Sequence, residues 1–180
     1  TKRPKAIGSS TPTSLFNGMI SPLLDYTIKG AIWYQGESNV GRHEQYSEIF
    51  PLMIENWREA WGIKDFPFYF VQIAPYVYGG VDSTESAFLR EAQEAALKLP
   101  NTGMAVTLDI ATVMNIHPPF KKEVGERLAY LALSKNYGKD VVSQGPEFKS
   151  MKVEGRRIRV LFSNTGGSLT AREGGLKEFE

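Results

Sequence analysis

The sequence predicts an α/β fold built on a parallel sheet, followed by the start of a β-rich module. Strand-like and helix-like segments alternate between residues 27 and 138, which is typical of parallel strands joined by helices. Beyond residue 138, apolar and polar residues alternate around a Glu-Gly pair, which indicates a β-hairpin. We therefore expect an α/β domain over residues 1–140 and a β-rich, sandwich-like module that begins in residues 141–180.

The first half of the chain contains a short helix, a strand and a long helix. Residues 16–24 carry apolar side chains at helical spacing, and residues 27–34, TIKGAIWY, have the β-branched and aromatic composition of a strand. Residues 43–61 repeat apolar and aromatic side chains every three or four positions, which predicts an amphipathic helix. Pro51 should kink or restart this helix, because proline lacks the N–H that a helix interior requires.

The next strand is the most apolar segment of the chain. Residues 66–75, FPFYFVQIAP, suit a central parallel strand that is covered on both faces. A helix follows, with Ser83 or Thr84 as its N-cap and an inner stripe of Phe88, Leu89, Ala92, Ala96 and Leu97. A short buried strand at residues 103–109 and a helix at residues 118–138 complete the alternation.

The composition argues against several classes of protein and site. A formal charge of +1 gives no electrostatic reason to expect nucleic acid or an anionic membrane as a partner. No cysteine is present, so there is no thiolate nucleophile or cysteine-based zinc site, and two histidines make a catalytic metal site weak. Neither a Walker motif nor G-x-G-x-x-G occurs, and apolar runs fall short of the roughly 18 residues that span a bilayer. We expect no cofactor, no metal and no membrane partner.

Polar residues lie at the ends of the first and third predicted strands and in the loops that follow. Gln35, Glu37 and Asn39 come after the first strand, and Asp109 and His117 come after the third. Ligands of open α/β sheets bind at the carboxyl ends of parallel strands, where these residues should meet. The sequence therefore predicts a site at this edge of the sheet.

Each of these residues has a catalytic and a structural interpretation. His117 is either a general base, because imidazole titrates near neutral pH, or a cap of the following helix. Asp109 either orients that imidazole or caps a turn at the strand end. Gln35, Glu37 and Asn39 either stabilise a developing oxyanion and hold substrate, or form a polar turn bonded to itself. Ser38 lacks the glycine two residues later that a nucleophile elbow requires, so we expect it to line the site.

Three segments together resemble the sialate O-acetylesterases of the SGNH hydrolase superfamily, relatives of the carbohydrate acetylesterases that act on xylan. They are LFNGMISPLLDYTIKGAIWYQGESNVGR, FPFYFVQIAP and DIATVMNIHPPFKKEVGERLAYLAL. The resemblance implies a three-layer α/β/α hydrolase that removes O-acetyl groups from sugars, without a metal, through an acyl-enzyme. The histidine of the family's IHP motif falls on His117, and Asp109 matches an acidic position of the family. The QGES segment implies that Gln35, Gly36 and Glu37 line the oxyanion site.

Two departures from the family pattern qualify this implication. No GQSN-like nucleophile motif is present, so we expect a segment of the same protein that precedes Thr1 to supply the serine. Met114 and Asn115 stand where superfamily members often carry an acidic residue before the histidine. We therefore expect a carboxylic ester hydrolase for acetylated sugars, with 9-O-acetylated sialic acid as substrate and a periplasmic or secreted location. An acetylxylan-type esterase and a non-catalytic carbohydrate-binding remnant are the alternatives.

Overall fold

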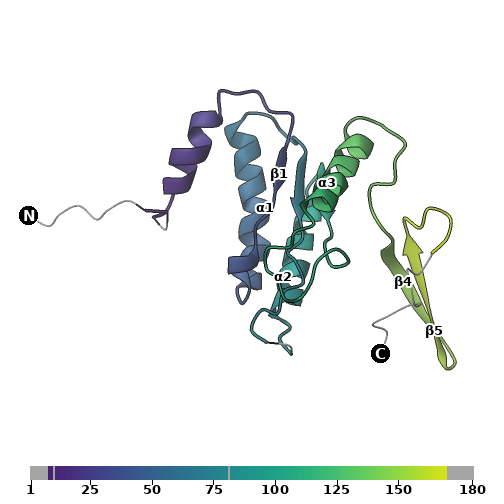
Figure 1. The fold of residues 1–180 in the computed structure, drawn as a ribbon. Coiled ribbons are helices and arrows are strands. Elements are labelled where there is room, and N and C mark those ends of the chain that lie inside the picture. Colours follow the sequence, from purple (N-terminus) through teal and green to yellow (C-terminus); the bar gives the residue numbers. More distant parts are fainter. Residues whose placement is uncertain (1–7, 10, 81, 170–180) are drawn as a thin grey trace, which may run out of the picture. The chain divides into compact units, whose positions relative to one another are not determined.

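A computed structural model describes residues 8–9, 11–80 and 82–169 (Figure 1). The chain divides into two compact units, one ending at Pro119 and the other beginning at Phe120. This division groups the last helix with the hairpin, whereas the sequence pattern placed the change of module near residue 140. Each unit is described by itself below.

The first unit contains a parallel sheet in the order β1-β2-β3. Its strands are β1 (Ala31–Trp33), β2 (Phe68–Val71) and β3 (Thr102–Ala105), which confirms the predicted α/β class. Every residue of β2 is buried, as expected of a central strand with both faces covered. The strands are shorter than the apolar segments that predicted them, because only the residues with a paired neighbour enter the sheet.

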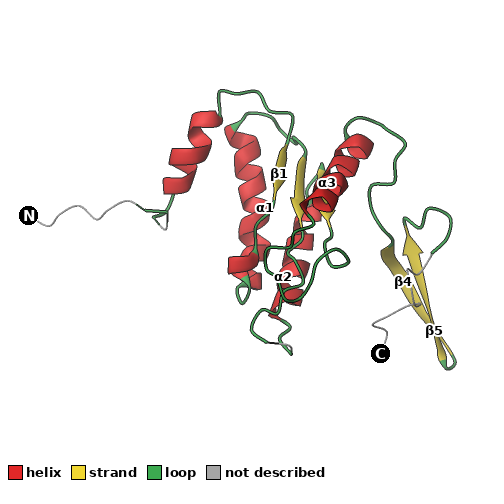
Figure 2. Cartoon of the chain, in the orientation of Figure 1, coloured by secondary structure: helices red, strands yellow, loops and turns green. Residues whose placement is uncertain are grey.

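Helices α1 (His43–Ala60) and α2 (Glu85–Glu94) connect these strands (Figure 2). Helix α1 continues through Pro51, so the predicted restart is wrong. The buried face of α1 holds Tyr46, Phe50 and Ile54 in the core, and this packing offsets the hydrogen bond that proline cannot donate. Phe88 of α2 is 43% exposed, which corrects its predicted place on the inner stripe.

Shorter helical segments accompany α1 and α2. Phe16–Ile20 forms a π-helical segment and Ser21–Leu23 a 3₁₀ segment, which confirms the predicted N-terminal helix. Glu37–Asn39 is a 3₁₀ turn after β1, and Ala95–Lys98 is a 3₁₀ turn that extends α2. Aromatic rings fill the space between α1 and the sheet: the Phe50 ring meets the Phe70 ring edge-on at 5.0 Å between centroids.

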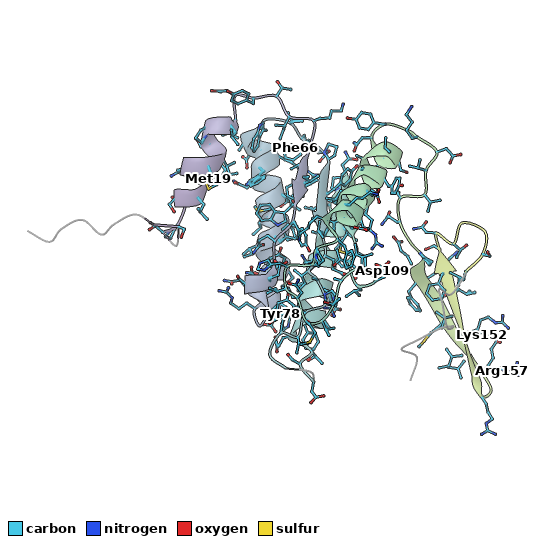
Figure 3. The ribbon with its side chains drawn as sticks, viewed as in Figure 1. Met19, Phe66, Tyr78, Asp109, Lys152 and Arg157 are labelled. Carbon is cyan, nitrogen blue, oxygen red and sulfur yellow. The ribbon has the colours of Figure 1, made fainter. Side chains whose placement is uncertain are left out.

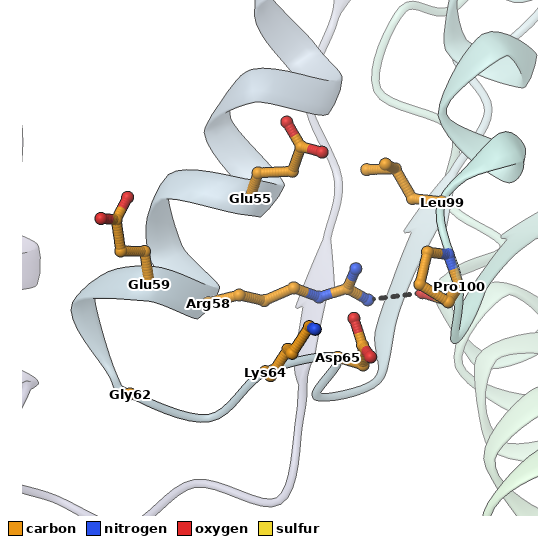
Figure 4. Close-up of a pocket in the computed structure, with 8 residues that line it drawn as sticks. All are labelled: Glu55, Arg58, Glu59, Gly62, Lys64, Asp65, Leu99 and Pro100. Carbon is orange, nitrogen blue, oxygen red and sulfur yellow. Dashed lines mark hydrogen bonds between the residues drawn. The ribbon is translucent and has the colours of Figure 1, made fainter.

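Arg58 of α1 holds the amino-terminal edge of the sheet. Its side chain is buried, and Nε and Nη2 donate to the Phe66 carbonyl at 3.1 and 2.8 Å. Nη2 also donates to the Pro100 carbonyl at 2.7 Å (Figure 4). Since Phe66 precedes β2 and Pro100 precedes β3, one guanidinium fixes the starts of both strands. A cavity of about 440 Å³ opens beside it, with Lys64 and Asp65 in its wall.

The second unit contains α3 (Lys121–Lys135) and an antiparallel hairpin of β4 (Glu147–Glu154) and β5 (Arg157–Ser163). Val124, Leu128 and Leu131 of α3 are buried, as its sequence predicted. Gly155 in the hairpin turn has a φ of 65°, a left-handed conformation that glycine adopts readily. Among the residues that the structure describes, no helix has the length and apolarity to cross a membrane.

Candidate active site

Three loops leave the carboxyl ends of the parallel strands, and their described residues within the first unit are 34–42, 72–80 with 82–84, and 106–119. Figure 3 labels Phe66 before β2 and Tyr78 after it, at opposite ends of the sheet, and Asp109 lies toward the end marked by Tyr78. The backbone N–H of Val77 donates to the carbonyl of Val113 at 3.0 Å, which joins the second and third loops. The predicted site residues therefore share one edge of the sheet.

The first loop is bonded to itself. Gln35 Nε2 donates to Asn39 Oδ1 at 2.8 Å, across the 3₁₀ turn that contains Glu37. The Tyr46 hydroxyl lies 3.3 Å from Gln35 Oε1 and 3.2 Å from the Gln35 carbonyl, and it can donate to either. For the side chains of Gln35 and Asn39, this geometry matches the structural interpretation of a self-bonded turn. The same hydrogen bonds hold the turn in one conformation.

Gly36 occupies a position that only glycine fits. Its φ of 154° belongs to a region that L side chains rarely adopt. A Cβ there would lie 2.8 Å from Ile73 Cγ2 and 3.2 Å from Gln93 Nε2. The backbone of the first loop therefore rests directly on the second loop and on helix α2.

Gln93 and Thr107 are two buried residues that the sequence pattern did not single out. The Gln93 amide joins the first loop to the end of β2, and the Thr107 hydroxyl donates to the carbonyls of Gln72 and Ile73 at 3.0 and 3.4 Å. Both residues are 0% exposed. A signal was available for Gln93, since it is a polar residue four positions after Leu89 on the inner stripe of α2.

The Glu37 carboxylate faces a group of tyrosines. Burial, with a smaller contribution from Glu37, raises the pKa of Tyr46 to about 12. The same two causes, burial first, raise the pKa of Tyr34 and Tyr78. Burial lowers the pKa of Arg90, and the nearby Tyr78 counteracts this effect. These tyrosines stay protonated at neutral pH. The side chains of Tyr46 and Tyr78 are buried, and the Tyr46 hydroxyl bonds to Gln35 within the protein.

His117 lies at the end of the third loop with its side chain exposed. Its backbone N–H donates to Asn115 Oδ1 at 2.9 Å, and the following Pro118 is buried, so the backbone at His117 is held from both sides. Asp109 is exposed on the same loop. Within the described ranges, no hydrogen bond joins the His117 ring to residues 35–39.

Ser38 is exposed, and its carbonyl accepts a hydrogen bond from Arg42 Nη2 at 2.8 Å. In the part of the chain that the structure describes, no group of three or more His, Cys, Asp or Glu side chains is placed to hold a metal ion. The groups at this edge include the amides of Gln35 and Asn39, the carboxylates of Glu37 and Asp109, and the imidazole of His117. They are suited to acid–base chemistry and to hydrogen bonding of a polyhydroxylated ligand.

Comparisons with known proteins identify relatives of this chain. The sialate O-acetylesterase of Mus musculus is 35% identical over 168 residues, which cover 83% of this chain and 31% of the mouse protein. The Homo sapiens sialate O-acetylesterase is 36% identical over 160 residues, which cover 77% of this chain and 30% of the human protein. The chain thus spans less than a third of the length of these relatives.

A carbohydrate acetylesterase of known structure has the same fold as this chain. The crystal structure of a carbohydrate acetylesterase from Xanthomonas citri superposes with a TM-score of 0.82 at 41% sequence identity, covering 89% of this chain and 38% of that protein. Residues 9–134 match the carbohydrate esterase family described as sialic acid-specific acetylesterase. This match includes all three loops of the candidate site. The chain therefore belongs to the sialic acid-specific acetylesterase family of carbohydrate esterases.

Proposed function

We propose that this chain is part of a serine esterase that removes O-acetyl groups from sugars, with 9-O-acetylated sialic acid as its substrate. The family match carries the proposal, because it spans residues 9–134 and so includes the ends of all three parallel strands. The names of the mouse and human relatives point to sialic acid as the sugar.

His117 acts as the general base in this proposal. Its imidazole accepts the proton of a serine hydroxyl while the serine oxygen bonds to the acetyl carbonyl carbon. The protonated imidazole then gives that proton to the sugar oxygen as the ester bond breaks. Water hydrolyses the acetyl-serine by the same proton transfers, which releases acetate. The exposed ring and the fixed backbone of His117 support this role, and Asp109 on the same loop is its candidate acidic partner.

The first loop forms the wall that faces the developing oxyanion. Gln35, Gly36, Glu37 and Asn39 carry this role, through backbone N–H groups and the side-chain amides. A self-bonded turn favours it, because an oxyanion is best stabilised by donors that do not reorganise during the reaction. The hydrogen bond between Gln35 and Asn39 provides that rigidity.

The nucleophilic serine comes, in this proposal, from a segment of the same protein upstream of Thr1. β1 is at one end of the three-stranded sheet, and Ile32 in its middle is 72% exposed. An apolar side chain that is exposed at the centre of a parallel strand suits a surface that further chain covers. A periplasmic or secreted location is part of the same proposal and rests on the family.

Acetate release tests the function directly. The complete protein and this chain alone are each given 4-nitrophenyl acetate, 9-O-acetylated sialic acid and acetylated xylan. We expect the complete protein to hydrolyse the first two and this chain alone to release no acetate. A preference for acetylated xylan would show that xylan, and not sialic acid, is the sugar from which the esterase removes acetyl groups. No release by a folded complete protein would overturn esterase activity and favour a carbohydrate-binding role.

The same assay tests Ser38 as the nucleophile. Robust release by this chain alone would place a nucleophile within these residues. The variant Ser38→Ala would then lose activity if Ser38 is that nucleophile and retain it otherwise.

A further inference from the structure

We propose that Gln93 is a positioning residue. It fixes the backbone of the first loop, residues 34–42, in the position from which that loop faces the developing oxyanion. This inference rests on the proposed esterase function. Gln93 lies on the buried face of α2 and is 0% exposed. Because its side chain is fully buried and contacts the Gln35 carbonyl, any effect on the reaction passes through the first loop.

The Gln93 amide uses both its donor and its acceptor. Nε2 donates to the carbonyl of Gln35 at 3.3 Å and to the carbonyl of Val71 at 3.2 Å. Oε1 accepts the backbone N–H of Ile73 at 2.9 Å. One side chain therefore joins the loop after β1 to Val71, the last residue of β2, and to Ile73 just beyond it.

Few other side chains can make this set of contacts. Asparagine has the same amide but is one methylene shorter, and a glutamate carboxylate would place negative charge against two carbonyl oxygens. Methionine has nearly the length of glutamine but donates no hydrogen bond. A buried amide with all partners in place specifies one arrangement of its surroundings, because each lost partner leaves a buried polar group unsatisfied.

Gly36 transmits this arrangement to the wall. Its Cα lies so close to Gln93 that a Cβ would be 3.2 Å from Nε2. The Gln93 side chain therefore packs directly against the backbone of Gly36. The carbonyl that accepts from Gln93 belongs to Gln35, the residue that bonds to Asn39 across the turn. A displacement of about 1 Å at a site that positions reacting groups can reduce the rate about a hundredfold.

Arg58 provides a matched control at the opposite edge of the sheet. It is also a buried polar side chain of a helix, and it also joins two backbone segments, at the carbonyls of Phe66 and Pro100. Replacing either residue by methionine removes a buried polar link and should lower the melting temperature. Only Gln93→Met acts on the edge that carries the candidate site.

The experiment compares Gln93→Met, Arg58→Met and wild type in the complete protein, at a temperature well below all three melting transitions. For 4-nitrophenyl acetate, we expect Gln93→Met to lower kcat about a hundredfold, with less than about a threefold change in KM. Arg58→Met should keep kcat within about threefold of wild type. Equal losses of kcat in both variants, or no loss in Gln93→Met, would overturn the positioning role.

Hydrogen exchange gives a second readout that does not depend on esterase activity. We expect backbone amides of residues 34–42 to exchange at least about tenfold faster in Gln93→Met than in wild type or Arg58→Met. If the wild type hydrolyses no ester, the proposed function fails, and this comparison still decides whether Gln93 holds the loop. Unchanged exchange over residues 34–42 in Gln93→Met would show that it does not.

Discussion

Gly36 and Ile73 lie so close together that a methyl group on Gly36 would be 2.8 Å from Ile73 Cγ2. Gly36 belongs to the loop after β1, and Ile73 follows the end of β2. The contact brings two loops that are far apart in the sequence into one surface. Any side chain at position 36 would separate them.

Gly36→Ala should therefore damage both stability and activity. We expect a loss of about 1–3 kcal/mol in the free energy of unfolding, from backbone strain and overpacking together. In the complete protein, kcat for 4-nitrophenyl acetate should fall, because the wall is displaced. Urea unfolding and initial rates measure the two effects.

Gly62→Ala is the matched control for this prediction. Gly62 also has a positive φ, of 64°, but a Cβ there would meet no atom within 4 Å. We expect it to lose stability through backbone strain alone and to keep full activity. Equal losses of unfolding free energy and of kcat in both variants would show that the close approach of Gly36 to Ile73 does not cause the effect of Gly36→Ala.

Thr107→Val should loosen the connection between the second and third loops. The Thr107 hydroxyl donates to carbonyls at the end of β2, and valine keeps the shape but leaves those carbonyls unsatisfied. We expect a loss of about 1–3 kcal/mol in unfolding free energy and a reduced kcat in the complete protein. Thr102→Val makes a comparable change at the start of β3, where Thr102 donates to the Leu99 carbonyl at 2.8 Å. If Thr102→Val lowered kcat as much, the effect would be one of stability rather than of position.

His117→Ala should remove most of the activity while the protein stays folded. Loss of a general base costs about two to four orders of magnitude in rate. The side chain is exposed, so the melting temperature should change little. His43→Ala is the control: His43 is the first residue of α1 and its ring stacks on Phe88 of α2 at 4.9 Å, so we expect less than about a tenfold change in kcat. A defect below tenfold in His117→Ala would make His117 a structural residue.

Ionisation of the Tyr46 hydroxyl should lower the free energy of unfolding in strongly alkaline solution. Its pKa is raised to about 12 in the folded protein, so the folded state holds the phenolic proton more tightly than the unfolded chain. This contribution is fully present below about pH 10, the ordinary tyrosine value, and is lost as pH rises through 12. The slope should be about 1.4 kcal/mol per pH unit in this window.

Tyr46→Phe isolates that contribution. Below pH 10 the variant should be less stable by about 1 kcal/mol, because the hydrogen bond to Gln35 is lost. Between pH 10 and 12 the difference should shrink and then change sign, because only the wild type loses stability through this hydroxyl and that loss exceeds the value of one hydrogen bond. Urea unfolding at pH 8, 10 and 11 measures the difference. Parallel curves for the two proteins would contradict the raised pKa.

Ile32→Ala tests the proposed covering of β1 by upstream chain. Ile32 is 72% exposed in the structure, so the substitution should cost this chain alone less than about 0.5 kcal/mol. In the complete protein, a covered Ile32 should cost about 2–5 kcal/mol, the range of buried isoleucine truncations. A small cost in both proteins would show that Ile32 stays exposed.

The sequence by itself determined the order and type of the elements in the α/β unit and the hairpin. The apolar segment that became β2, the stripes of α1 and α3, and the alternation in β4 and β5 are local patterns that periodicity shows directly. It also predicted which strand ends would carry polar residues, because the chain order places loops after strands. Family membership followed from residues that stand close together in the sequence.

Only the tertiary structure decided which residues hold the edges of the sheet together. Gln93 contacts a carbonyl 58 positions away, and Arg58 contacts one 42 positions away. Pro51 stays within α1 because the core holds the helix, and Gly36 is required because Ile73 lies against it. Such contacts depend on the packing of segments far apart in the chain, so neither propensity nor spacing encodes them locally. The positions of the candidate groups at the site are set by these distant contacts.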